Sequence, residues 1–125
     1  MSATFEQLVA WAAAEVEDTL ALLPPELREK ARALPVTYEP VPNAGLQEDG
    51  IAPDTLGLFV GPDFSDEELT PIPLPPQIII FVDNLWDFVE GDEEIFREEV
   101  HTTFLHELGH YLGFGEDDLW DRGLD

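Results

Sequence analysis

Apolar residues near the start of the chain recur at three- and four-residue steps. Over residues 4–23 they are Phe5, Leu8, Val9, Ala12, Val16, Leu20 and Leu23. This spacing places them on one face and predicts an amphipathic helix. Thr4, with Gln7 three residues later, has the pattern of a capping box that would begin this helix.

Prolines divide the next part of the chain. Pro24 and Pro25 end the first helical pattern. A proline ring is tolerated in a first helical turn, so a second short helix is predicted over Glu26–Ala33. Pro35 stops it.

Three short runs predict β-strands: Val36–Glu39, Leu56–Val60 and Gln77–Val82. The last, QIIIFV, is continuous and β-branched, which is typical of a strand covered on both faces. Between the second and third runs, residues 61–76 are acidic and proline-rich, a composition that indicates a loop. Residues 83–91 are predicted to form a connection.

A long helix is predicted over Asp92–Leu112. Glutamates are frequent at its start, where carboxylates favour the positive end of the helix dipole, and Gly113 and Gly115 are natural stop residues. Its apolar stripe consists of Ile95, Phe96, Val100, Phe104 and Leu108. The pattern predicts an α+β fold in one domain, residues 1–125, in which a small mixed sheet packs on helices.

Composition limits the chemistry that this chain can use. A chain of 125 residues suits one compact core, and the absence of cysteine excludes disulfides, thiolate metal ligands and cysteine nucleophiles. The N-terminal segment has no basic region, and Glu6 and Glu15 interrupt its apolar residues, so we expect no signal peptide. No run is apolar enough to cross a bilayer, and a cytoplasmic location is predicted.

The chain is strongly acidic, with 28 acidic residues against five basic ones and a net charge of −23. Such a charge argues against binding nucleic acid through phosphates and against docking on anionic membranes. The simpler interpretation is a solvated acidic surface that maintains solubility. The alternative is an electrostatic field that attracts basic peptides or proteins.

The predicted last helix contains the spacing H-E-x-x-H at His106, Glu107 and His110. Residues four apart lie on one helix face, so both imidazoles can reach one metal ion. Glu107 lies about 100° around the helix from His106, where it can act as general base towards water activated by the metal. Without cysteine, these ligands suit one zinc ion per chain.

Two histidines leave a catalytic zinc site one protein ligand short. The frame continues as H-E-x-x-H-x-x-G-x-x-E, in which Gly113 can turn the chain and Glu116 is the candidate third ligand. Asp117 and Asp118 are its rivals. A ligand glutamate on a later helix, as in thermolysin-like enzymes, is excluded because no glutamate follows Glu116.

His101 is the third histidine of the chain and precedes His106 by five residues. That offset is about 140° around a helix, so His101 should point away from the metal. We expect it to be a surface or packing residue.

From about Val36 to the C-terminus the sequence resembles a family of small bacterial zincin-like zinc metallopeptidases. The resemblance rests on L-G-L-F-V-G, P-P-x-I-I-I-F, E-E-V-x-x-T-x-L-H-E-L-G-H and G-F-G-E-D-D-L, in this order. It implies a minimal zincin fold whose metal is held by both motif histidines and an acidic residue after the glycine. That acid is commonly Asp in the family, whereas Glu116 stands here. The metzincin frame is also similar, but its methionine turn is missing because Met1 is the only methionine.

Two functions follow from these features. The leading hypothesis is a zinc-dependent metallopeptidase with Glu107 as general base, acting on peptides or proteins that the acidic field would bias towards basic ones. The alternative is a non-catalytic, metal-stabilised binding or regulatory module whose acidic surface engages a basic partner. A structural site needs no glutamate in the second motif position, which favours catalysis.

Overall fold

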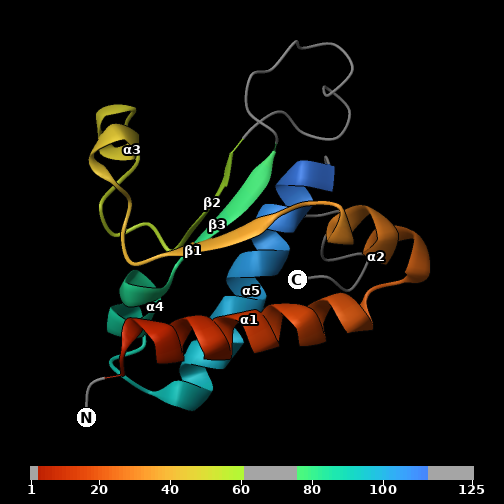
Figure 1. Cartoon of the computed structure of the whole chain (residues 1–125), viewed down its shortest axis with the longest axis horizontal. Helices are drawn as coiled ribbons and strands as arrows, with labels where there is room; N and C mark the ends of the chain where they lie inside the picture. The colour runs from red at the N-terminus through yellow and green to blue at the C-terminus, as the bar shows by residue number, and fades with distance from the viewer. Residues whose placement is uncertain (1–2, 61–75, 113–125) are drawn as a thin grey trace.

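Helices and short strands alternate along the chain. The computed structural model describes residues 3–60 and 76–112, in which it has five helices and three strands (Figure 1). In chain order these are α1 (Phe5–Leu22), α2 (Pro25–Arg32), β1 (Val36–Glu39), α3 (Ala44–Glu48), β2 (Gly57–Val60), β3 (Gln77–Phe81), α4 (Val82–Phe88) and α5 (Glu93–Leu112). Within these residues no helix is both long and apolar enough to span a membrane. The fold is α+β, as the sequence predicts.

The three strands form a mixed sheet in the order β1-β3-β2. β3 pairs in parallel with β1 and antiparallel with β2, so β2 forms one edge. Ile78 and Ile80 of β3 are fully buried, whereas Ile79 between them is only half-buried. The sequence predicts a strand that is covered on both faces. In the part of the chain that the structure describes, one face of β3 is fully covered and the other is partly covered. The run is apolar because β3 is the central strand.

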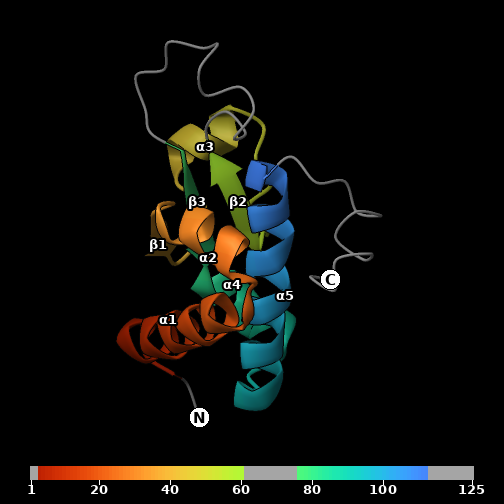
Figure 2. The same cartoon turned by 90° about the vertical axis from the view of Figure 1, so that its right-hand side faces the viewer.

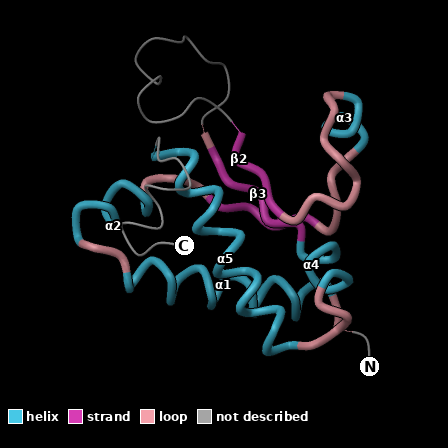
Figure 3. The backbone as a smooth tube through the Cα atoms, turned by 180° about the vertical axis from the view of Figure 1, so that it is seen from behind, coloured by secondary structure: helices cyan, strands magenta, loops and turns pink. Residues whose placement is uncertain are grey.

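Helices α1 and α5 build the core with the sheet. α5 contacts α1, β2 and β3, and α1 crosses α5 below the sheet (Figure 2). The core lies between the sheet and the two long helices, which Figure 3 shows from behind. Its buried apolar residues come from both helices and from β3, among them Leu8, Ala12, Val16, Ile78, Ile80, Phe96, Val100, Phe104 and Leu108.

Helix α1 begins at the predicted capping box. The Thr4 hydroxyl accepts a hydrogen bond from the Gln7 N–H at 3.1 Å, and the Thr4 N–H donates to Gln7 Oε1 at 3.0 Å. Each bond gives a partner to a backbone N–H that the first turn of the helix would otherwise leave unpaired. The other two predicted helices, like α1, begin and end within one residue of their observed bounds.

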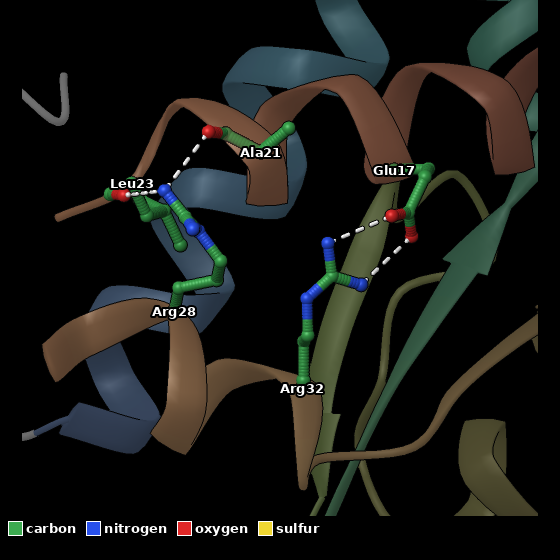
Figure 4. A network of polar contacts seen from close by, with 5 residues as sticks. All are labelled: Glu17, Ala21, Leu23, Arg28 and Arg32. Carbon is green, nitrogen blue, oxygen red and sulfur yellow. Dashed lines mark hydrogen bonds and ion pairs between the residues drawn. The ribbon is translucent and has the colours of Figure 1, made fainter. Parts of the chain in front are cut away.

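Residues of α2 close the other end of α1 (Figure 4). The Arg28 guanidinium donates to the carbonyls of Ala21, at 3.2 Å, and Leu23, at 2.9 Å. These are carbonyls that the last turn of a helix leaves without intrahelical donors. Arg32 donates to both carboxylate oxygens of Glu17 at 3.1 and 2.8 Å, and this ion pair lowers the pKa of Glu17. α2 thus fastens to α1 through two arginines.

Two helices differ from the sequence prediction. Residues 82–88, predicted as a connection with Val82 closing a strand, form α4. The helix forms because Val82 and Leu85 are fully buried, while Trp86 packs edge-on against the ring of Phe96. α3 was not predicted either; Asn43 begins it by accepting a hydrogen bond from the Leu46 N–H at 2.9 Å.

Candidate metal and catalytic site

Helix α5 presents the two motif histidines to solvent. His106 and His110 are exposed and lie one turn apart. Their Nε2 atoms are 3.2 Å from each other, and their ring centroids are 4.8 Å apart. The helix thus brings these two nitrogens together, as the spacing predicts.

Glu107 is held by the main chain of the edge strand. Its Oε1 accepts a hydrogen bond from the Phe59 N–H at 3.0 Å. The Phe81 N–H bonds the Leu56 carbonyl, so in the alternation of an antiparallel pair Phe59, opposite Ile78, turns its N–H away from β3. The edge of β2 that faces away from β3 therefore orients the carboxylate.

The half-buried position of Glu107 alters its acidity. Burial raises the pKa of this carboxyl above its ordinary value, because desolvation disfavours the charged form. His110, His106 and the Phe59 N–H each act in the opposite direction and lower the pKa. Burial is the largest of these effects, so Glu107 is a stronger base than an exposed glutamate.

Gly57 allows β2 to lie against α5. A Cβ built at Gly57 would be 2.5 Å from Thr103 Cγ2 and 3.6 Å from Glu107 Cγ. The first distance is shorter than real Cβ contacts, so any larger residue would push the strand away from the helix. The sequence pattern predicts a strand here but no role for Gly57 or Phe59. The signal was present, since a glycine inside a strand often marks the close approach of another element.

The three motif side chains fit a metal ion. One ligand atom from each of His106, Glu107 and His110 lies within 4.8 Å of the others, and in the described ranges no other group of this kind occurs. Two nitrogens bound to one tetrahedral zinc at about 2.0–2.1 Å lie about 3.3 Å apart, close to the separation of the two Nε2 atoms. The candidate third ligands Glu116, Asp117 and Asp118 lie outside the described residues, as do Gly113 and Gly115.

Comparison with known families agrees with this geometry. A family model described as "zincin-like metallopeptidase" matches residues 31–124. The chain belongs to this family. No curated protein matches it. The zincin-like family and fold predicted from the sequence are confirmed, and the family implies a peptidase chemistry that uses zinc.

In this zincin-like chain an open pocket adjoins the motif. It has a volume of about 290 Å³ and lies between α5 and the start of β2. Its walls are formed by Leu56, Gly57, Glu99, Thr102, Thr103, His106 and Glu107. One wall of the pocket thus belongs to the candidate site.

His101 lies on the other side of the zincin-like helix α5. Its Nδ1 is 2.7 Å from the hydroxyl oxygen of Thr19 in α1. The same hydroxyl donates to the Glu15 carbonyl at 2.8 Å, so Nδ1 carries the proton and donates to Thr19. His101 therefore packs between two helices and takes no part in the motif cluster, in agreement with its predicted direction.

Proposed function

We propose that the chain is a zinc-dependent metallopeptidase in which His106 and His110 hold the metal and Glu107 is the general base. The observation that carries the proposal is the placement of Glu107. Its carboxylate is fixed by the Phe59 N–H beside two histidine nitrogens that are 3.2 Å apart. A structural site has no need for a base in this position.

Each residue has a defined task in this reaction. When bound, zinc supplies a Lewis acid that polarises a carbonyl and makes water a stronger nucleophile at neutral pH. The hydrogen bond from Phe59 orients Glu107 through Oε1, and we assign Oε2 to proton transfer. Glu107 accepts the proton of the attacking water and passes it to the departing amine.

The edge of β2 is the proposed docking site for a peptide substrate. Gly57 occupies a position of the antiparallel pair whose N–H and carbonyl face away from β3, and the Phe59 carbonyl faces the same way, whereas the Phe59 N–H is bonded to Glu107. An extended peptide can add to such an edge through main-chain hydrogen bonds. Antiparallel addition is the more stable arrangement per residue. It would carry a peptide bond across the face on which His106 and His110 lie.

Glu116 is the proposed third ligand, with Asp117 as the alternative, for one zinc per chain. The frame after His110 supports this proposal. Removing the true ligand should weaken zinc binding strongly, whereas removing its neighbour should have little effect. Zinc titration of Glu116→Ala and Asp117→Ala distinguishes the two candidates. A zinc affinity equal to that of wild type in both variants would exclude both residues.

The decisive experiment compares wild type with Glu107→Gln on a peptide library. Glutamine keeps the shape and the bond from Phe59 but cannot take a proton. We expect cleavage by zinc-loaded wild type and a loss of about 10²- to 10⁴-fold in the variant, with zinc content unchanged. His110→Ala should instead lose the metal. Equal cleavage by wild type and Glu107→Gln would overturn the assignment, and metal-loaded wild type without activity would favour the binding module.

A further inference from the structure

The pocket beside Glu107 lies at one end of the proposed substrate edge. Gly57 of β2 approaches Thr103 and Glu107, whereas Phe59 bonds Glu107 and its ring centroid is 5.6 Å from that of Tyr111. β2 and α5 therefore run in the same direction here. The pocket lies beside the start of β2 and the middle of α5, close to Gly57 and Thr103.

This direction determines which substrate residue would meet the pocket. A peptide antiparallel to β2 starts near Tyr111 and ends near Thr103. Its scissile bond lies at Glu107, so the residues that follow this bond pass over Gly57 and the pocket. With about 290 Å³, the pocket is smaller than typical small-molecule sites and is suited to a single side chain.

Glu99 gives this pocket a negative charge of its own. It lines the pocket and is half-buried, and the described part of the chain offers it no ion pair. Arg97 on the same helix is 3.2 Å from Glu93 and lies over the ring of Trp11, towards α1. Among the residues that the structure describes, no lysine or arginine lines the pocket.

The remaining walls suit the stem of a long side chain. Leu56 is apolar, and Thr102 and Thr103 each carry a methyl group and a hydroxyl, so these lining residues combine apolar and hydrogen-bonding groups. Lysine and arginine bury an aliphatic stem while the charged group reaches a polar partner. A neutral apolar side chain would leave the Glu99 carboxylate partly desolvated and unpaired.

We infer that this pocket binds the lysine or arginine side chain of the substrate residue that follows the scissile bond, and that Glu99 determines this specificity. The inference rests on the proposed function, because that function defines the scissile bond. A net negative charge would attract basic peptides whatever the position of their lysine or arginine. Our inference instead assigns the preference to the Glu99 carboxylate and to one position of the substrate.

A binding experiment tests the pocket without turnover. Peptides of otherwise identical sequence are titrated into zinc-loaded Glu107→Gln. Each peptide carries either lysine or norleucine, and this residue stands either immediately before or immediately after one central peptide bond. We expect the peptide with lysine after the bond to bind about three- to tenfold more tightly than its norleucine partner. Adding Glu99→Gln should abolish this difference.

Glu98→Gln is the matched control. It removes the same charge from the neighbouring position of α5, but Glu98 is exposed and does not line the pocket. The lysine preference should survive this substitution. Equal effects of the two variants, a preference independent of lysine position, or no binding of any peptide would overturn the inference.

Cleavage mapping with wild type separates the inference from the proposed function. Wild type should cut before basic residues, and Glu99→Gln should cut with that preference lost. Cleavage without a basic preference would overturn the inference and leave the peptidase assignment intact. Absence of cleavage, together with Glu99-dependent lysine binding, would refute the peptidase and support the pocket.

Discussion

The polar side chains on two sides of helix α5 differ in burial and in hydrogen bonding. On the side that faces α1, His101 is partly buried and is paired with the Thr19 hydroxyl, which is itself buried. On the side that faces β2, His106 and His110 are exposed, and Glu107 is anchored to β2 by the Phe59 N–H. One helix thus has a packed side with satisfied polar groups and an open side that offers nitrogen ligands.

The contrast separates stability from chemistry along one element. A residue on the packed side fills space or satisfies a buried partner, so its loss should weaken the fold. A histidine on the open side does neither, and its loss should affect the metal instead. The two sides can therefore be tested independently.

The largest expected effect is that of Phe104→Ala on the packed side. Phe104 is 1% exposed within the core, and truncating such a residue creates a cavity. We expect a loss of about 3–5 kcal/mol in the free energy of unfolding, measured by urea denaturation without added metal. His106→Ala is the control and should change stability by less than about 0.5 kcal/mol. Similar losses in both variants would remove the distinction between the two sides.

An intermediate effect is expected where the open side meets β2. Gly57→Ala places a Cβ against Thr103 Cγ2, and overpacking of this kind destabilises by about 1–3 kcal/mol. It should also reduce activity by displacing the Phe59 N–H from Glu107. Thr103→Ser removes the obstructing methyl group, so the double variant should recover most of the stability and activity.

The measurement is a double-mutant cycle from urea denaturation and peptide cleavage. Strictly additive effects of Gly57→Ala and Thr103→Ser would show that β2 does not depend on this contact for its position.

The smallest effect should come from Thr19→Val. Valine keeps the shape but removes the hydroxyl that pairs with His101 and Glu15, which leaves the imidazole N–H without its partner. We expect a loss of about 1–2 kcal/mol in thermal or urea unfolding, with Thr19→Ser closer to wild type. Zinc affinity should be unchanged, and a marked decrease would link the two sides of the helix.

Much of the helical framework could be predicted from the sequence because the signals are local. The Thr4 and Gln7 cap, the prolines before α2 and the spacing of His106 and His110 act within one or two turns. For the same reason the spacing predicts that the side chains of His106, Glu107 and His110 lie close together, as they do, whereas their roles stay a prediction. The third ligand stays a prediction.

Other features depend on distant parts of the chain. The apolar run that forms β3 continues into α4, and the change from strand to helix is set by the burial of Leu85 and the packing of Trp86. The bond between Phe59 and Glu107 joins residues 48 positions apart and depends on strand register. The Glu99 pocket arises from the same approach of β2 to α5 and could not be read from local patterns.

The hydrogen bonds from Arg28 and Arg32 of α2 to α1 bear on where the folded unit begins. The family model starts at residue 31, inside α2, so α1 lies outside the recognisable segment. Yet Trp11 of α1 packs edge-on against Phe96, and Thr19 pairs with His101. A fragment that begins at residue 31 would lack Arg28 and the α1 groups with which Arg28 and Arg32 pair, and it would expose the side of α5 that packs on α1. The segment that matches the family model is thus shorter than the segment that is needed to bury the hydrophobic core.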